Sequence, residues 1–232
     1  MSLSGVIVFV GTVGAGKSTH MKLLASKLKK NNYKVTTTSL KSGHLFAYFL
    51  ELLLVKLLSL QSEKDSSLIK ILVEKRPQLF RKLFKLIVAL DVVSIYCRFL
   101  FVVYIPKKLG YILIVEEYIP ATIADYVALA GFVGVNQKCL PIFLNLFSKL
   151  TYLGEPIHTV LLDASNDTLE NRWVHRKSPF QRFDYLNMQR TLLFSVSKKL
   201  SSSFLFINNN DKTIENTSNL IMNFLYTDST NA

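Results

Sequence analysis

The sequence predicts an α/β fold in which a parallel sheet lies between two layers of helices. Short apolar runs rich in β-branched residues alternate along the chain with longer segments whose apolar residues recur at helical spacing. A glycine-rich phosphate-loop sequence also stands between the first apolar run and the first helical segment. Alternation of this kind places strands in parallel with helices on both faces of the sheet.

Five segments have the composition of strands. Each is short and rich in apolar or β-branched residues, which is typical of strands buried in a parallel sheet. Glu116 and Glu117 follow the third segment directly, and Asp163 follows the fourth. In a parallel sheet these carboxylates lie at the edge where ligands bind. The expected strands are residues 3–10, 33–39, 111–115, 157–162 and 204–207.

The segments between the strands repeat apolar residues at helical spacing. Pro77 is expected in a turn or in the first turn of a helix, and Pro106 is expected to interrupt or end the longest helix. Residues 61–67 are polar and are expected to form a loop. The expected helices are residues 20–30, 45–60, 82–103, 121–129, 141–149, 168–175, 185–200 and 213–225.

Neither an internal repeat nor a linker divides the chain, and its 232 residues suffice for one domain with a sizeable core. We therefore expect a single domain over residues 1–226 and a polar, frayed tail at residues 227–232. Hydrophobic residues make up 50% of the sequence and charged residues 19%, which excludes a disordered chain.

Residues 11–19 form a complete G-x-x-x-x-G-K-[ST] phosphate loop. The glycines permit close approach of the backbone, so that the amides of residues 14, 15 and 16 can point at phosphate oxygens. Lys17 is expected to reach the β- and γ-phosphates of ATP, and the Ser18 hydroxyl to coordinate Mg²⁺. The expected ATP-binding residues of the loop are Gly11, Thr12, Val13, Gly14, Ala15, Gly16, Lys17, Ser18 and Thr19.

The net charge of +12 raises the possibility of a nucleic-acid partner. However, the basic residues are scattered, and no RRM-like or zinc-finger pattern accompanies them. Nucleotides also require positive charge around them. We expect nucleotide substrates and no nucleic-acid partner.

The two cysteines, Cys97 and Cys139, stand far apart in apolar stretches. We expect buried thiols in a reducing compartment, and no metal-ligand spacing connects them. The N-terminus leads directly into the first strand rather than into a charged-then-apolar leader, so a cytoplasmic protein is expected.

Residues 45–60 and 83–105 are unusually apolar. The first segment contains Glu51 and Lys56, and the second contains Lys85, Asp91 and Arg98, so neither provides a charge-free span of about 20 residues. We expect buried or dimer-facing helices and no membrane span.

The order of these parts resembles the thymidylate kinase family over nearly the whole chain. Residues 161–172 are similar to the family's L-L-D-x-x-P-E-x-x-x-x-R stretch. His175-Arg176 and the sequence Gln-Arg-Phe-Asp at residues 181–184 resemble its lid elements, R-G and D-R-F-E. The resemblance implies a P-loop NTPase three-layer α/β/α sandwich with a five-stranded parallel sheet and a short Arg-rich lid at about residues 174–184.

The family transfers the γ-phosphoryl group of ATP to dTMP with Mg²⁺ and forms homodimers through helices. Arginines suit such a site because phosphoryl transfer depends on positioning and charge stabilisation. Glu116 stands where the family's D-R-Y motif begins and is expected, with Ser18, to hold the metal. By resemblance, the catalytic residues are Lys17, Arg172, Arg176, Arg182 and Glu116, with Arg172 also contacting ATP.

On the acceptor side, the resemblance places Arg98 at the acceptor phosphate, with Lys41 as a further positive charge. The expected acceptor-side residues are Arg98, Lys41, Glu117, Tyr118, Tyr96 and Ser94. This side departs from the family at four points: Val13 replaces an acidic residue, Glu117 replaces the D-R-Y arginine, Ser94 replaces an aromatic residue that stacks on thymine, and residues 39–43 replace an E-P-G element.

The leading hypothesis is therefore a nucleoside monophosphate kinase, with dTMP as the favoured acceptor. A second hypothesis is a kinase for a nucleoside or another alcohol, in which Glu116 or Glu117 is the base for a hydroxyl. A third is a non-catalytic ATP-binding protein whose apolar segments contact a partner.

Overall fold

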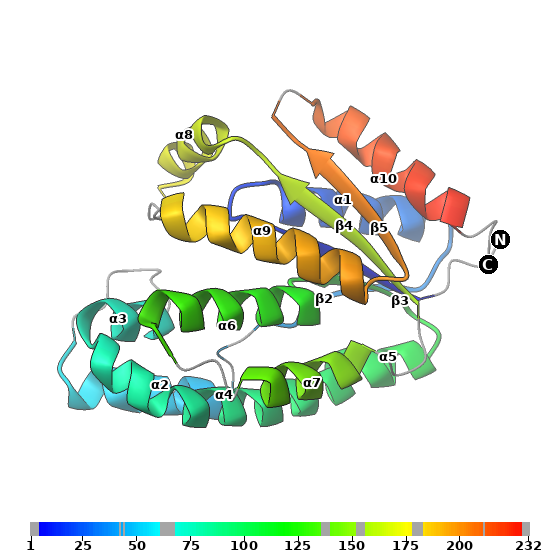
Figure 1. Ribbon diagram of the computed structural model, residues 1–232. Helices are drawn as coiled ribbons and strands as arrows, with labels where there is room; N and C mark the ends of the chain where they lie inside the picture. The colour runs from blue at the N-terminus through cyan, green and yellow to red at the C-terminus, as the bar shows by residue number, and fades with distance from the viewer. Residues whose placement is uncertain are drawn as a thin grey trace.

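The computed structural model describes residues 5–41, 43, 45–60, 68–135, 140–151, 156–177, 183–210 and 212–228. Five strands form one sheet in the order β2-β3-β1-β4-β5, and all four neighbouring pairs are parallel (Figure 1). This confirms the predicted five-stranded parallel sheet. The strands are β1 (Val6–Gly11), β2 (Val35–Ser39), β3 (Ile112–Glu116), β4 (Ile157–Asp163) and β5 (Ser203–Asn208).

The helices cover both faces of the sheet, as expected for a P-loop NTPase α/β fold (Figure 1). α1 and α10 lie on one face, and α6 and α9 lie on the other, with α2, α3, α4 and α7 beyond α6. The helices are α1 (Lys17–Lys30), α2 (Leu45–Leu57), α3 (Leu68–Lys75), α4 (Pro77–Phe99), α5 (Ile105–Lys108), α6 (Ile119–Val133), α7 (Leu140–Thr151), α8 (Asn166–Arg176), α9 (Phe183–Leu200) and α10 (Ile214–Asp228).

Alternating residues of β1 enter two separate cores. Ile7 and Phe9 pack with α1 and α10, whereas Val6, Val8 and Val10 pack with α4, α6 and α9. A strand that is buried on both faces has a continuous apolar sequence, which is why β1 could be predicted. The sheet order then places β3 and β4 on either side of β1 and brings their carboxyl ends next to the phosphate loop.

The longest helix differs from the expectation. α4 begins at Pro77 and continues through a π-helical turn, η1 (Leu100–Tyr104), into α5, which contains Pro106. Proline lacks an amide hydrogen, and its ring clashes with the carbonyl four residues earlier in an α-helix. The π turn widens the helix just before this point, so the helix continues past the proline instead of ending there.

Within the described part of the chain, the segment Pro77–Lys108 is the one helix of sufficient length and apolar composition to cross a membrane. However, 44% of its most apolar stretch is buried inside the protein. Asp91 lies on its buried face and accepts hydrogen bonds from the Gly43 amide (2.9 Å) and the Tyr126 hydroxyl (2.8 Å). One face of this helix therefore belongs to the core.

Further differences from the expectations concern α3, α10 and Cys97, and two other expectations are left open. α3 was not predicted, because four of its apolar residues, Ile69 and 71–73, leave no clear helical period. α10 continues to Asp228 and so includes the first residues of the expected tail. Cys97 is exposed rather than buried, since it lies on the outer face of α4. The expected loop at residues 61–67 and Cys139 lie outside the described residues.

Candidate functional site

The phosphate loop connects β1 to α1 through backbone conformations that require glycine. Gly11 has a φ of 145°, and a Cβ at this position would lie 1.9 Å from the Leu162 carbonyl oxygen of the neighbouring strand. Gly16, with a φ of 103°, is the N-cap of α1. These constraints are the physical reason for the glycine spacing of the motif.

Side chains hold the carbonyl groups of the loop, and three of the four donor residues come from distant parts of the chain. All five carbonyls of residues 11–15 accept a side-chain hydrogen bond, which fixes the loop backbone. The donors are Lys17 Nζ to Gly11 (2.8 Å) and Thr12 (3.1 Å), Trp173 Nε1 to Val13 (2.8 Å), Arg172 Nη1 to Gly14 (3.0 Å) and Asn209 Nδ2 to Ala15 (3.0 Å).

α1 begins at Lys17, directly after the loop, and the beginning of a helix leaves amide groups unpaired and carries a partial positive charge. This arrangement suits an anion. One amide differs from the expectation, because the Ala15 N–H donates to the Thr12 carbonyl (3.2 Å) and closes a turn within the loop.

Ser18 and Glu116 meet beside the loop. Glu116 ends β3 and pairs in register with Phe9 of β1, so its carboxylate lies next to the first turn of α1. The Ser18 hydroxyl is 3.0 Å from Glu116 Oε1 and 3.2 Å from Oε2. Both residues border a cavity of about 220 Å³ that is also lined by residues 37–39 of β2.

This pair fits a Mg²⁺ ion chemically. Mg²⁺ prefers oxygen ligands and is usually held by one or two carboxylates together with substrate phosphates and water. Among the described residues, no group of three or more His, Cys, Asp or Glu side chains forms a complete protein cage. A hydroxyl and a carboxylate beside a phosphate loop are what a nucleotide-bound Mg²⁺ requires.

Glu117 connects the phosphate-loop lysine with a second lysine. Its Oε1 lies 3.2 Å from Lys17 Nζ and its Oε2 lies 2.6 Å from Lys41 Nζ, while the side chain is 18% exposed. Burial alone would raise the pKa of Glu117, but the charges of Lys17 and Lys41 outweigh it and lower this pKa. The pKa of Lys41 is raised: burial acts to lower it, and the carboxylate of Glu117 outweighs that effect.

The backbone of Glu117 is left-handed, with a φ of 54°, which is unfavourable by about 1 kcal/mol for a residue with a Cβ. Its amide donates to the Phe9 carbonyl (3.0 Å), so the end of β3 is tied to β1 in this conformation. The turn directs consecutive carboxylates to different partners: Glu116 to Ser18 and Glu117 to the two lysines.

The acceptor-side residues are only partly brought together. Arg98 donates from Nη2 to the Ser39 carbonyl (2.8 Å), two residues before Lys41. Burial lowers the pKa of Arg98, and Asp91 opposes this. Arg98, Lys41 and Glu117 thus lie around the carboxyl ends of β2 and β3.

Three other predicted acceptor-side residues are engaged elsewhere. Ser94 is fully buried, accepts from the Phe46 amide (3.1 Å) and donates to the Leu90 carbonyl (2.8 Å). Tyr118 is buried in the core. Tyr96 lies on another face of α4 and donates to the Leu146 carbonyl of α7 (2.9 Å), so the structure does not bring it to Ser94.

A buried acidic pair supports the chain segment between β2 and α2. Glu51 is 2% exposed, and burial together with the nearby charge of Asp91 raises its pKa to about 8. Its Oε1 has no hydrogen-bond partner in the described part of the chain. Sequence reasoning noted both acids only as charges within apolar helices, which was the available signal for a buried polar cluster.

The arginines expected to act on ATP have different environments. Arg172 bonds to the Gly14 carbonyl and, through Nη2, to the Asn209 carbonyl (2.9 Å). Burial, and secondarily the charge of Arg176, lowers the pKa of Arg172. Arg176 is exposed in the last turn of α8. Arg182 lies outside the described residues, as do the other residues of the segment 178–182 in the middle of the expected lid.

Sequence reasoning missed Trp173 and Asn209. Both contact the phosphate loop, Trp173 from the buried side of α8 and Asn209 from the carboxyl end of β5. The polar run at residues 208–210 directly after a strand was the available signal for Asn209. Trp173 gave no signal beyond being the single tryptophan of the chain.

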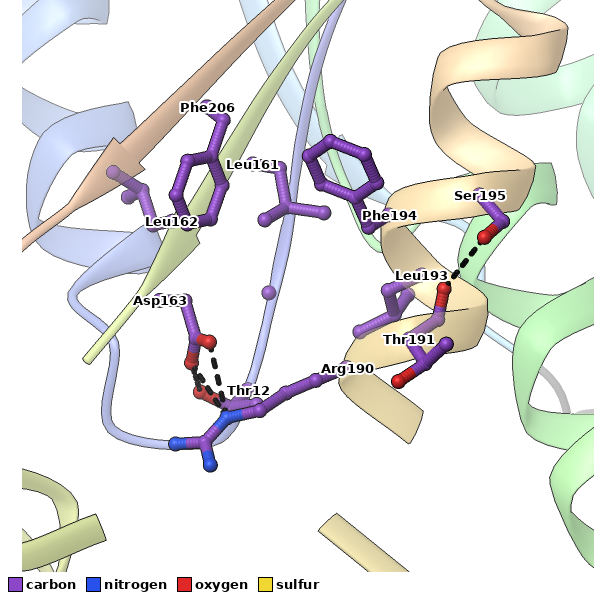
Figure 2. Close-up of a pocket in the computed structure, with 11 residues that line it drawn as sticks. Thr12, Leu161, Leu162, Asp163, Arg190, Thr191, Leu193, Phe194, Ser195 and Phe206 are labelled. Atoms are coloured by element: carbon purple, nitrogen blue, oxygen red, sulfur yellow. Dashed lines mark hydrogen bonds and ion pairs between the residues drawn. The ribbon is translucent and has the colours of Figure 1, made fainter. Parts of the chain in front are cut away.

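Asp163, at the end of β4, secures the loop from the side of α9, as Figure 2 shows. It accepts from the Thr12 hydroxyl (3.0 Å) and forms an ion pair with Arg190 Nε (3.0 Å). Arg190 also donates to the Ala164 carbonyl and to Asn166, so its guanidinium is fully engaged. A cavity of about 340 Å³ beside this network has an apolar wall that includes Phe194 and Phe206.

Comparison with protein-family models found no match, and comparison with curated proteins found none either. Comparison with solved structures found a similar fold in a thymidylate kinase from Candida albicans, described as having broad substrate specificity and a novel structural element. The TM-score is 0.58 and the sequence identity 14%, over 97% of this chain and 92% of the other. The likeness shows that the two chains share an α/β fold.

Proposed function

We propose that the protein is a nucleoside monophosphate kinase that transfers the γ-phosphoryl group of ATP to a nucleoside monophosphate. The observation that carries the proposal is the arrangement of Ser18 and Glu116, 3.0 Å apart, beside Lys17 at the head of the parallel sheet. This arrangement supports the proposal, because a hydroxyl and a carboxylate suited to Mg²⁺ lie beside a lysine and a helix beginning suited to phosphate.

In this proposal, the loop amides and Lys17 hold the β- and γ-phosphates. Ser18 and Glu116 would hold Mg²⁺, which when bound neutralises phosphate charge. An acceptor phosphate oxygen attacks the γ-phosphorus, and the bond from that phosphorus to the oxygen of the leaving ADP breaks. Arg172, Arg176 and Arg182 remain proposed as the cations that stabilise the transferring group.

Arg98 and Lys41 are proposed to hold the acceptor phosphate, because they are the cations at the carboxyl end of β2. dTMP is the first acceptor to test, since the resemblance and the structural similarity both lead to thymidylate kinases. Ser94, Tyr96 and Tyr118 stay predictions as acceptor-binding residues.

The proposal includes a homodimer and a reducing, cytoplasmic environment. We assign the dimer contact to the outer face of α2, where Phe49, Leu53 and Leu57 are exposed. Cys97 is a free thiol on the surface, which suits a reducing compartment.

A second candidate function is favoured by Glu117. A carboxylate between Lys17 and Lys41 opposes an acceptor phosphate, but it can accept the proton of an acceptor hydroxyl. In that reaction the hydroxyl oxygen bonds to the γ-phosphorus, its proton passes to Glu117, and ADP leaves. The substrate would then be a nucleoside or another alcohol.

The test is ADP production from Mg·ATP with dTMP, dUMP, UMP, CMP, AMP, GMP and thymidine as separate acceptors. Stimulation by a monophosphate that is lost in Lys17→Ala supports the first proposal, and stimulation by thymidine alone supports the second. ATP binding without stimulation by any acceptor would contradict both and leave a non-catalytic nucleotide-binding protein.

A further inference from the structure

The outer face of the long helix formed by α4, η1 and α5 is apolar and exposed. Phe101 is 66% exposed and Leu109, just after α5, is 62% exposed. The exposed apolar residues of this face extend over about 28 Å from residue 86 to residue 105, at 1.5 Å per residue. They are Leu86, Val93, Tyr96, Leu100, Phe101, Tyr104 and Ile105. We call this surface the α4 outer face.

Exposed cations stand at both ends of the α4 outer face. Arg81, Lys82 and Lys85 precede its apolar part, and Lys108 follows it. Lys108 Nζ lies 5.6 Å from the centre of the Tyr104 ring, which places the last cation directly beside the apolar surface. The sequence of residues 77–111 contains a single acidic residue, Asp91, and its side chain is fully buried.

This charge pattern argues against a second copy of the chain as the partner. If two α4 outer faces packed in parallel, each cationic end would meet the same cationic end of the partner helix. If they packed antiparallel, Lys82 and Lys85 would approach Lys108. Because neither orientation offers an acidic residue on this face, self-association would bring like charges together.

An anionic lipid surface provides the negative charge that the α4 outer face lacks, together with an apolar phase for its exposed side chains. Interfacial helices bury an apolar face at the boundary between headgroups and acyl chains, with lysines and arginines contacting anionic headgroups. Tyrosine, here Tyr96 and Tyr104, is a residue type enriched at that depth. The opposite face of the helix carries the buried Asp91 and packs in the core, so the helix would lie in the membrane plane rather than cross it.

We propose that the α4 outer face docks the folded protein onto the surface of an anionic lipid bilayer. The inference is independent of the acceptor and of the phosphoryl-transfer proposal, because Lys82, Lys85, Phe101 and Lys108, which its test replaces, lie outside the candidate site.

The test is co-flotation of the full-length protein with vesicles of phosphatidylcholine alone and of phosphatidylcholine mixed with phosphatidylglycerol. We expect binding to the anionic vesicles that weakens with salt. Replacing Lys82, Lys85 and Lys108 together by Gln should weaken it on the order of 100-fold, since each lysine near such a surface contributes about fivefold. Phe101→Glu should weaken it at least about tenfold.

Ile214→Glu is the matched control, because Ile214 is 57% exposed and lies at the start of α10, on the other side of the sheet. It should leave vesicle binding unchanged. Circular dichroism and ATP binding should be the same in all variants, which separates lost docking from lost folding.

Absence of flotation, equal binding to neutral and anionic vesicles, or equal loss in Ile214→Glu would each overturn the proposal. Light scattering tests whether a second copy of the chain covers the α4 outer face instead. If Phe101→Glu converts a dimer into a monomer, the face is covered by a second copy and the proposal is wrong.

Discussion

Replacing Glu117 by Gln should distinguish a phosphate acceptor from a hydroxyl acceptor. The substitution keeps the shape of the side chain and removes its charge from between Lys17 and Lys41, which lie 3.2 Å and 2.6 Å away. At an effective dielectric constant of about 20, these separations correspond to attractions of roughly 5 and 6 kcal/mol before desolvation is subtracted. In Glu117→Gln, neither lysine is paired with this carboxylate, so the positive charges of both are available to an anionic substrate.

For a monophosphate acceptor, this change is favourable. Each negative charge of an acceptor phosphate about 6 Å from Glu117 is repelled by roughly 3 kcal/mol at the same dielectric constant. Even if half of this repulsion is screened, KM for dTMP should fall about tenfold. For a hydroxyl acceptor, removing the base should instead lower kcat with thymidine by about 10² to 10⁴.

The assay is steady-state ADP production with each acceptor at saturating Mg·ATP. Glu117→Asp, which keeps the charge, is the control for side-chain replacement at this position. If Glu117→Gln changes neither KM for a phosphate acceptor nor kcat for a hydroxyl acceptor, the carboxylate does not face the acceptor and the electrostatic argument fails.

Three further predictions test other parts of the site. Glu51 has a pKa of about 8 in the folded protein and an ordinary value of 4.5, so the free energy of unfolding should fall as pH rises between these values. Glu51→Gln removes the group that titrates, so its thermal unfolding should depend less on pH over this range and its Tm at pH 8 should be higher. Arg98→Ala should raise acceptor KM about 10- to 100-fold with little change in KM for ATP, and equal changes in both would remove Arg98 from the acceptor side. Trp173→Phe deletes the hydrogen bond to the Val13 carbonyl and should raise KM for ATP up to about tenfold; an unchanged affinity in isothermal titration with ATP would mean that Trp173 does not hold the loop.

The ATP side of the site was predictable from the sequence because it depends on local geometry. The glycines of the loop, the lysine and the serine are adjacent in the chain, and Glu116 follows a strand whose burial is visible as an apolar run. Only the order β3-β1-β4 was needed to bring Glu116 to Ser18. In contrast, Trp173 and Asn209 contact loop carbonyls from positions 160 and 194 residues away, and no local pattern identifies these contacts.

The acceptor side was less predictable because its residues are placed by packing between helices. Tyr96 and Ser94 were both expected on the acceptor side, but positions two residues apart on a helix are separated by about 200°. Tyr96 consequently contacts α7, while Ser94 is covered by the first turn of α2. The π turn was also missed, because Pro106 was expected to interrupt or end the helix, whereas the helix continues past it.

Glu117 contacts a lysine in each half of the proposed site, so under the proposed function the binding of ATP should change the binding of the acceptor. Lys17 belongs to the phosphate loop and Lys41 to the segment after β2, and one carboxylate forms an ion pair with each of them. When the γ-phosphate of ATP takes Lys17 as its partner, Glu117 loses one of its two cations and its interaction with Lys41 becomes its main support. An acceptor phosphate then competes for Lys41 against a carboxylate that has no alternative cation. ATP should therefore weaken the binding of a phosphate acceptor, and by reciprocity the acceptor should weaken the binding of ATP by the same factor. For an acceptor hydroxyl the same event leaves Glu117 more basic, because one of the charges that lower its pKa has been withdrawn.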